Sequence, residues 1–493
     1  MTVPPSPSET TGAGGSTSPV LPRAVHWFTN GVLAFPLLYL AAALGYALTV
    51  FARNGFQSRK LLVACLLLSA AVAAGLALMC VRTRWKANLA LLGSSAFGAL
   101  LALESTLAFR GHDYADLTRI ARHCRRLGLP YDDRTRLEVV LDERAKGRRA
   151  YPCVHPSAFW SGMYSFTFRN RPFLPLSGIS EAHTVVENEF GYYFTYEADE
   201  FGFHNPYGLH RPGATQVALV GDSYTQGCSV RSEACFAALV RREYPGTLNL
   251  GLRGNGPLTE LATLREYVAP HRPRAVFWFF YEGNDLADLE QEKGTPLARY
   301  LEPGYRQDLP GLAPELNREL ARWADEQVGR ESVYLLGRRD LRHYEPWTSI
   351  LLFRRLRRAR SLVKEALNHP PPQQSGANSQ AVLVNSPDFR TLEAVLRRAR
   401  DDVRAWGGKL VFVYLPQYGR YYNPSRYYDP CAPVSDLVRR LNIPYVDMRE
   451  PFGRAPDPLS LFPFREGGHY TPEGYRLVAD AVLEQLHRIL PNR

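Results

Sequence analysis

Ser223 is the first residue of the chain whose type and position could support covalent chemistry. The segment QVALVGDSYTQG places it directly after an apolar run that can form a strand, and a run that can begin a helix follows. A side chain at such a junction lies at the carboxyl end of a strand, where α/β sheets bind their ligands, and a helix start offers free N–H groups to an oxyanion. Serine and aspartate are also common helix caps, so this segment alone leaves a nucleophile and a cap both open.

Two further turns follow apolar runs. LNLGLRGNGP contains glycines that permit tight turns and close backbone approach to a bound group, and FWFFYEGNDLADL places Asn284 where its amide could donate to the same oxyanion. The alternative for Asn284 and Asp285 is that they only turn the chain and cap the next helix.

His469 supplies a candidate base. It lies in FREGGHYTPEGYRLVADAVLEQL, just before a helix whose start is marked by Thr471 and Pro472. A serine hydroxyl becomes a good nucleophile when a histidine takes its proton and a carboxylate fixes the tautomer of that histidine. Glu466, three residues before His469, can fold back to hold the imidazole.

The elements that must position these residues form an α/β pattern. From about residue 185, short β-rich runs alternate with helical segments, which is typical of a parallel sheet covered on both faces. A stretch at about 290–388 is too long for a plain crossover, so we expect a helical insertion there, which contains the basic amphipathic run WTSILLFRRLRRARSLVKEAL. The predicted strands are Gln216–Val220, Thr247–Leu250, Ala275–Tyr281, Lys409–Leu415 and Tyr445–Met448.

Four signals in sheet order, a GDS turn, a glycine turn, a GND turn and E-x-x-H before the last helix, resemble the SGNH (GDSL-type) hydrolase family. The positions that match the Ser, Gly, Asn and His of its name are Ser223, Gly254, Asn284 and His469. The resemblance covers roughly residues 185–490 apart from the insertion. It implies an α/β three-layer, flavodoxin-like domain with a mostly parallel five-stranded sheet.

The family resemblance also implies roles for these residues. Ser223 would attack an acyl carbon and His469 would act as base and then as acid, while the N–H groups of Ser223 and Gly254 and the Asn284 amide would hold the oxyanion. The family usually has Asp three residues before the histidine, whereas this chain has Glu466. We expect no cofactor and no metal.

The N-terminal part predicts a membrane anchor. Residues 1–24 form a Pro-, Ser- and Gly-rich tail, and residues 25–110 contain about three spans, followed by a connecting region at 111–184 and the hydrolase-like domain at 185–493. Glu104 near the end of the third span must lie at the interface or pack inward. The predicted spans are Trp27–Phe51, Leu61–Val81 and Leu89–Phe109.

Charge leaves the orientation and the partners partly open. The net charge of +11 suits anionic lipid, an acidic polymer or nucleic acid, but we find no nucleic-acid module signature and expect no such partner. Basic residues after the third span favour a cytoplasmic domain. Long domains escape that rule, however, so we expect an extracytoplasmic one. The seven cysteines have neither metal-ligand spacing nor the density of a disulfide scaffold.

We therefore expect a membrane-anchored serine esterase acting on acyl esters, with O-acetyl groups of a cell-surface glycan or another small ester as substrate. The segment NEFGYYFTYEADEFGFHNP resembles the membrane-attached subgroup linked to polysaccharide O-acetylation, which implies polysaccharide-synthesis membrane proteins as partners. An O-acetyltransferase that uses the same residues stays an alternative. So does a non-catalytic glycan-binding or scaffold module.

Overall fold

The computed structural model of the chain divides into two compact units. The first comprises Met1–Asp116 and Arg338–His369, and the second comprises Leu117–Gly337 and Pro370–Arg493. The residues that the structure describes are 22–53, 59–82, 84–110, 119–160, 167–168, 171–172, 174–341, 350–351, 353, 356, 384, 386–424, 427 and 429–490.

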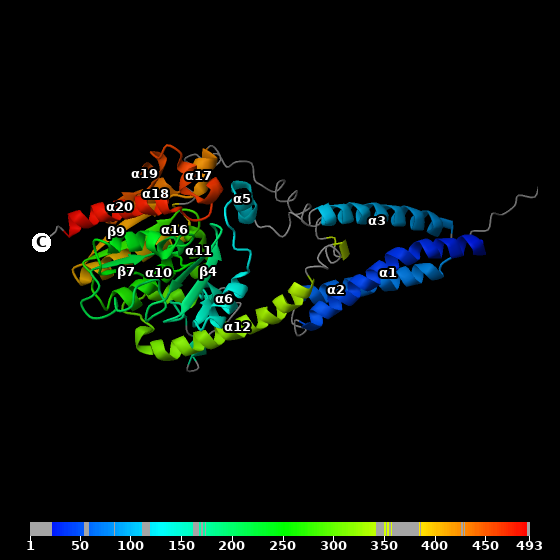
Figure 1. Ribbon diagram of the computed structural model, residues 1–493, viewed down its shortest axis with the longest axis horizontal. Coiled ribbons are helices and arrows are strands. Elements are labelled where there is room, and N and C mark those ends of the chain that lie inside the picture. The colour runs from blue at the N-terminus through cyan, green and yellow to red at the C-terminus, as the bar shows by residue number, and fades with distance from the viewer. Residues whose placement is uncertain are drawn as a thin grey trace, which may run out of the picture. The chain divides into compact units, whose positions relative to one another are not determined.

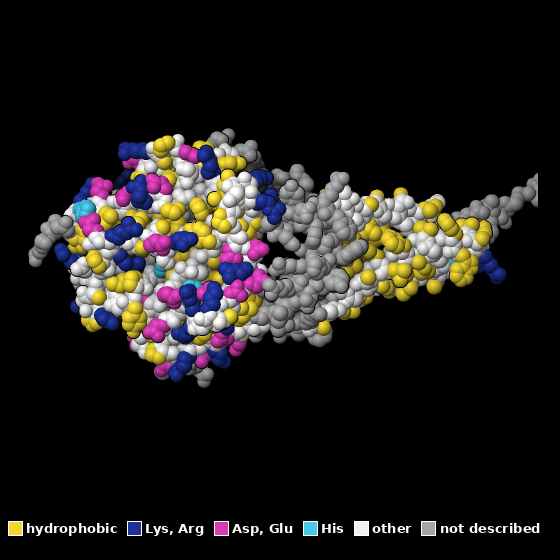
Figure 2. All heavy atoms as spheres, in the orientation of Figure 1, with side chains coloured by type: hydrophobic (Ala, Val, Ile, Leu, Met, Phe, Trp, Pro, Cys, Tyr) yellow, Lys and Arg dark blue, Asp and Glu magenta, His cyan; other side chains and the backbone are white. Residues whose placement is uncertain are grey.

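Three long apolar helices form most of the first unit (Figure 1). They are α1 (Arg23–Arg53), α2 (Arg59–Cys80) and α3 (Arg84–Arg110). Their segments Arg23–Thr49, Leu62–Cys80 and Trp85–Leu107 are each long and apolar enough to cross a membrane, as the sequence predicted. On the face drawn in Figure 2, hydrophobic side chains dominate these helices, whereas charged side chains of both signs cover the second unit.

The single carboxylate predicted inside the third span packs inward. Glu104 is fully buried, and its carboxylate accepts a hydrogen bond from the backbone N–H of Leu356 at 2.9 Å. Burial among protein groups is one of the two ways in which an acidic side chain is tolerated at membrane depth. Most of the predicted basic amphipathic helix, and residues 1–21 of the predicted tail, lie outside the described residues.

A five-stranded, all-parallel sheet is the centre of the second unit. Its order is β10-β9-β8-β6-β7, so β6 lies between β7 and β8. The chain runs from β6 outward to β7 on one side and then returns past β6 to β8 on the other. The carboxyl end of such a strand is where open α/β sheets bind ligands. The predicted sheet and its strands are confirmed: β6 (Val217–Val220), β7 (Thr247–Asn249), β8 (Ala275–Tyr281), β9 (Lys409–Leu415) and β10 (Tyr445–Asp447).

Helices cover both faces of this sheet, which gives three layers. Successive β6 residues alternate between two buried clusters: Ala218 and Val220 belong to one, and Val217 and Leu219 to the other. The first cluster includes residues of α10 (Pro257–Thr263), α11 (Asp285–Glu292), α16 (Pro387–Ala405) and α18 (Cys431–Arg440). The second includes residues of α9 (Phe236–Arg241), α19 (Arg449–Gly453) and α20 (Pro472–Ile489).

A smaller sheet stands beside the large one. Strand β4 (His183–Asn188) is central, with β1 (Ala150–Pro152) parallel on one side and β5 (Tyr193–Glu197) antiparallel on the other. The two helices α5 (Arg119–Leu127) and α6 (Arg136–Ala145) precede it. Residues 119–160, which lie within the connecting region that we expected at 111–184, therefore contribute three helices and a strand to the unit that contains the large sheet.

The remaining elements are short, apart from one helix in the expected insertion. That stretch contains η3 (Pro296–Leu301), η4 (Pro310–Leu312) and the long α12 (Ala313–Leu341). The others are α7 (Ser157–Trp160), α8 (Ser223–Gln226), α17 (Tyr418–Tyr422), β2 (Thr167–Phe168), β3 (Arg171–Pro172), η1 (Ser232–Ala234), η2 (Leu264–Val268), η7 (Pro458–Leu461) and η8 (Pro463–Arg465).

Candidate active site

Ser223 and His469 form a direct hydrogen bond, with 2.7 Å between Ser223 Oγ and His469 Nε2. Ser223 opens α8 directly after β6, and the N-cap Asp222 accepts from the N–H of Tyr224 at 2.9 Å. His469 lies just before α20, which Thr471 caps. The structure thus joins two residues that are 246 positions apart, in the arrangement needed for a histidine to take the serine proton.

The second nitrogen of the imidazole faces a carboxylate from the small sheet. Glu189 follows β4, and its Oε2 lies 2.8 Å from Nδ1 of His469 and also accepts the backbone N–H of His469 at 3.0 Å. Ser229 Oγ donates to the same oxygen. A carboxylate in this place fixes the tautomer and orientation of the ring and favours its charged form.

A second carboxylate stands two residues earlier. Oε1 of Glu187 lies 3.6 Å from Nδ1 of His469, and Oε2 pairs with Arg253 at 3.1 Å. Glu187 lies within β4 and Glu189 directly after it, and both carboxylates face the imidazole. Arg253 immediately precedes Gly254, so this pair connects the surroundings of the base to the glycine turn.

Glu466, which the sequence favoured as the partner of His469, points elsewhere. Its Oε1 lies 2.6 Å from Nε2 of His123 on α5, and the His123 ring stacks on Phe464 with 5.6 Å between ring centroids. The backbone is the reason: Phe464 and Arg465 both have positive φ, at 52° and 59°, so the chain reverses before Glu466. His123, Glu466 and Glu189 line a pocket beside this loop.

Sequence reasoning missed Glu189 because it lies 280 positions from His469. Two signals could have found it. E-N-E places two acids at the end of a strand, and Gly468 directly precedes the histidine. A Cβ at Gly468, where φ is +94°, would lie 2.9 Å from Glu189 Oε2, so a glycine is needed to admit the carboxylate.

The charges of the site act on each other's proton affinity. Burial of His469 opposes its protonation, but the charge and hydrogen bond of Glu189, with a contribution from Glu187, raise the pKa of His469 above its ordinary value. Burial likewise opposes ionisation of Glu189, yet the neighbouring His469 holds the pKa of Glu189 below its usual range. Ionised Glu189 therefore stabilises protonated His469 once Ser223 gives up its proton.

Gly254 and Asn284 end up beside Ser223 in sheet order, after β7 and β8. Gly254 has φ of +72°, and its turn is tied to α8 because the N–H of Arg253 donates to Oε1 of Gln226 at 3.1 Å. The Asn284 amide donates to Oδ2 of Asp288 at 2.8 Å, so one of its two N–H groups already has a partner. The oxyanion roles of both residues stay predictions.

Five carboxylates gather behind the Ser223 turn. Burial raises the pKa of Asp222, and it raises those of Asp288 and Glu292 to about 7 each. The pKa values of Glu260 and Asp285 lie well above their ordinary values, first through burial and then through the neighbouring acids. Neither carboxylate oxygen of Glu260 has a hydrogen-bond partner among the described residues.

One group of side chains in the described part of the chain could hold a metal ion. The ligand atoms of Glu187, Cys228 and His469 lie within 4.8 Å of one another. An ion there would need the Nδ1 nitrogen of His469, which the carboxylate of Glu189 already holds. We therefore assign these three residues no metal.

No protein-family model matches the chain, and no curated protein is significantly similar to it in sequence. Solved structures match just over half of the chain at low identity. A lipase/acylhydrolase from Enterococcus faecalis is 13% identical over 57% of this chain and 99% of its own, with a TM-score of 0.31. The match to a putative lipolytic protein of the G-D-S-L family from Desulfitobacterium hafniense covers 56% of this chain and 99% of that protein, at 12% identity and a TM-score of 0.29. The match to an acetyl xylan esterase covers 55% of this chain and 98% of that protein, at 12% identity and a TM-score of 0.29.

Replacing Glu189 should separate its role from that of Glu466. Because the Glu189 charge raises the pKa of His469, Glu189→Gln should lower that pKa and move the acidic limb of kcat/KM for a small ester to lower pH, while reducing the maximum. Glu466→Gln changes a side chain that pairs with His123 and should leave the limb in place. A shift in Glu466→Gln with none in Glu189→Gln would contradict this assignment.

The buried Glu260 makes a prediction about stability. Its folded pKa lies above the ordinary value of 4.5, so the folded state keeps a proton that the unfolded chain loses as pH rises. The stability that the bound proton gives is complete below pH 4.5 and is lost as pH rises towards the folded pKa. The free energy of unfolding of Glu260→Gln should therefore rise relative to that of wild type between pH 5 and pH 8, by up to about 1.4 kcal/mol per pH unit. Thermal unfolding in detergent at both pH values measures this gain, and a pH-independent difference would contradict it.

Proposed function

We propose that the chain is a membrane-anchored serine esterase that works through an acyl-enzyme on Ser223. One observation carries the proposal: the 2.7 Å contact between Ser223 and His469, whose other ring nitrogen lies 2.8 Å from Glu189. Nucleophile, base and orienting carboxylate are each within hydrogen-bond reach of the next, which is the geometry of a catalytic triad. The three apolar helices support attachment to a membrane.

The proposed reaction uses this line of contacts in both directions. His469 takes the Ser223 proton as Oγ attacks the acyl carbon, and the imidazolium formed is stabilised by Glu189. His469 then gives that proton to the departing alcohol. In the second step a water, or a hydroxyl of an acceptor, loses its proton to His469 and takes the acyl group, and Ser223 recovers its proton. The same residues therefore serve hydrolysis and transfer.

An acetylated glycan is the substrate that we propose, on the evidence of a tyrosine pair beside the His469 loop. The rings of Tyr418 and Tyr422 on α17 stack at 5.2 Å and 19°, and 66% of Tyr422 is exposed. The hydroxyl of Tyr418 donates to the carbonyl of Arg465 at 3.1 Å, and its ring would lie 3.4 Å from a Cβ at Gly467. Exposed aromatic faces pack well against the C–H faces of sugar rings.

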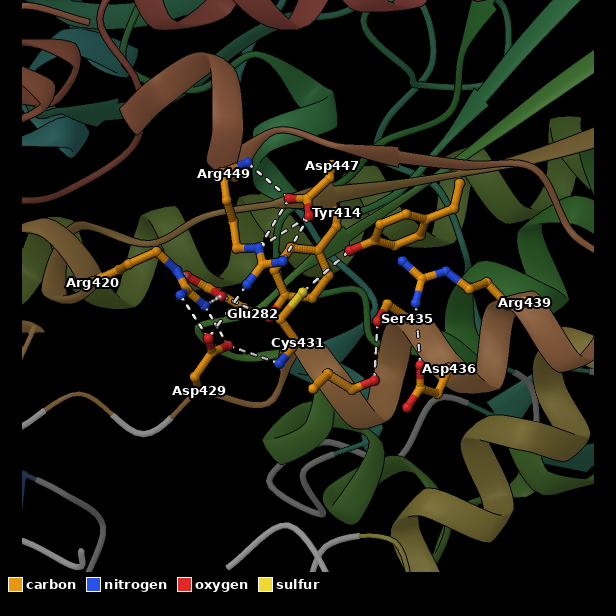
Figure 3. Close-up of polar contacts among 12 residues, drawn as sticks. Glu282, Tyr414, Arg420, Asp429, Cys431, Ser435, Asp436, Arg439, Asp447 and Arg449 are labelled. Atoms are coloured by element: carbon orange, nitrogen blue, oxygen red, sulfur yellow. Dashed lines mark hydrogen bonds and ion pairs between the residues drawn. The ribbon is translucent and has the colours of Figure 1, made fainter. Parts of the chain in front are cut away.

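The short helix that carries this pair is firmly anchored (Figure 3). Arg420, between the two tyrosines, donates to the fully buried carboxylate of Glu282 at 2.5 and 2.9 Å and to Asp429 at 2.6 and 2.9 Å. Glu282 follows β8, two residues before Asn284, and also accepts the Tyr414 hydroxyl at 2.6 Å. Tyr418 and Tyr422 are thus tied to the carboxyl-terminal end of β8, at the same end of the sheet as Ser223. This supports a preformed surface for a sugar ring.

Removing the Ser223 hydroxyl tests the mechanism. Ser223→Ala should abolish labelling of the full-length protein by a fluorophosphonate and lower p-nitrophenyl acetate turnover at least about a thousandfold, because no acyl-enzyme can form. Ser460→Ala, at an exposed serine, serves as the control and should behave as wild type. Unchanged ester turnover in a folded Ser223→Ala protein would rule out the mechanism.

The tyrosine pair tests the substrate class. Tyr422→Ala should lower kcat/KM about three- to tenfold for a partially O-acetylated xylo-oligosaccharide, as expected for loss of one ring contact, and leave p-nitrophenyl acetate turnover unchanged. Tyr207→Ala is a matched control, since Tyr207 is 65% exposed and the guanidinium of Arg211 lies 6.0 Å from the centroid of its ring. Equal losses in the two variants, or none in either, would argue against a glycan platform on α17.

A further inference from the structure

A second serine and histidine pair lies close to the glycine turn. His155 and Ser157 follow β1, which pairs with β4, and the N–H of Cys153 donates to the carbonyl of Val185 at 2.8 Å. The same small sheet thus delivers Glu189 to the imidazole and residues 155–157 to another part of the site. Sequence reasoning gave this segment no function.

The pair packs directly against Gly254. Nδ1 of His155 lies 2.7 Å from Oγ of Ser157. A Cβ added to Gly254 would lie 2.5 Å from Ser157 Oγ and 3.5 Å from His155 Nδ1. Ser157 therefore occupies the space that any other residue at position 254 would need, and His155 lies at van der Waals distance from that space.

The glycine turn needs support from outside. Gly254 has φ of +72°, and Gly251 and Gly256 flank it, so the chain itself imposes little on the direction of the Gly254 N–H. Two hydrogen bonds hold the turn to the Ser223 side: Arg253 N–H to Gln226, at 3.1 Å, and Asn255 Nδ2 to the carbonyl of Gly221, at 3.2 Å. His155 and Ser157 cover the Cα of Gly254.

The protonation state of the His155 imidazole is consistent with a fixed support for Gly254. Burial, with smaller contributions from Arg253 and Arg136, lowers the pKa of His155 to about 4, so the ring is neutral at pH 7. A neutral ring adds no second positive charge beside Arg253, whose ion pair with Glu187 is then undisturbed. Ser157 gives the ring a defined hydrogen-bond partner.

We propose that His155 and Ser157 are positioning residues that hold Gly254 so that its N–H points at the oxyanion. The proposal rests on the serine mechanism above, in which that N–H is a donor. A donor held in advance stabilises the charge that develops in the transition state more than it stabilises bound substrate. Loss of the support should therefore act on kcat and hardly on KM.

Single variants test this division. In the full-length protein, His155→Ala and Ser157→Ala should lower kcat for p-nitrophenyl acetate about 10- to 100-fold with KM within about twofold, and slow fluorophosphonate labelling similarly. His155→Asn keeps a polar atom near the Nδ1 position and should recover much of the loss. His271→Ala is the matched control, since His271 is also half-buried, has a pKa lowered by burial and contacts another side chain, His210, at 3.2 Å.

A pair of double variants tests the contact itself. Gly254→Ala should be costly, and Ser157→Gly should restore part of its activity by removing the oxygen that the new Cβ meets. Ser157→Gly should not restore Gly251→Ala, whose Cβ would meet Gln226 and Thr225 instead.

The outcomes separate the two proposals. If wild type is labelled at Ser223 while the His155 and Ser157 variants keep the wild-type kcat, the positioning role is overturned and the esterase stands. If wild type is not labelled, the proposed function is overturned and the positioning role falls with it. Raised KM with unchanged kcat would also overturn the positioning role.

Discussion

The carboxylate of Glu189 beneath Nδ1 of His469 is the contact on which the arrangement of the site depends. A partly buried imidazole next to a serine is useful as a base only if its charged form is stabilised, and here the stabilising carboxylate comes from the small sheet. The neighbouring structure is consistent with that requirement. Gly468 leaves room for the carboxylate, Ser229 and the His469 N–H donate to it, and β4 brings it to the edge of the large sheet.

The acids behind Ser223 show a different use of burial. Asp222 caps α8, Glu292 accepts three backbone N–H groups at the start of α10, and Asp285 accepts the N–H of Tyr281, so these carboxylates fasten the turns that follow β6, β7 and β8. Burial disfavours the charged forms of these carboxylates and is the main reason that their pKa values rise, and neighbouring acids add to the rise at Glu260, Asp285 and Asp288. The raised pKa values reduce the negative charge close to the place where an oxyanion would form.

The sequence was sufficient for the large sheet because its signals are local. Apolar runs of strand length and the turn residues after them predicted all five strands to within one residue at each end. The same locality explains the wrong choice of Glu466. Three positions before His469 is close in sequence, but left-handed residues at Phe464 and Arg465 send that side chain to α5.

The groups that sequence reasoning missed come from far along the chain. Glu189 directly follows β4, which belongs to the small sheet and not to the five-stranded one. His155 lies in a segment without a periodic pattern, and only its contact with Gly254 distinguishes it from an ordinary half-buried histidine. Ser223 and His469 were predicted as a pair and do form one, while their roles in turnover stay predictions.

The small sheet has a consequence for how the protein acquires its site. Residues 155, 189, 223 and 469 must meet, and 280 positions separate Glu189 from His469, so no fragment that folds early during synthesis can contain the whole constellation. Bringing such distant segments together costs chain entropy before the contacts that offset this cost have formed, which slows folding. The site is completed only when the segment that leads into α20 docks, so a chain that lacks this segment would carry Ser223 with no base beside it.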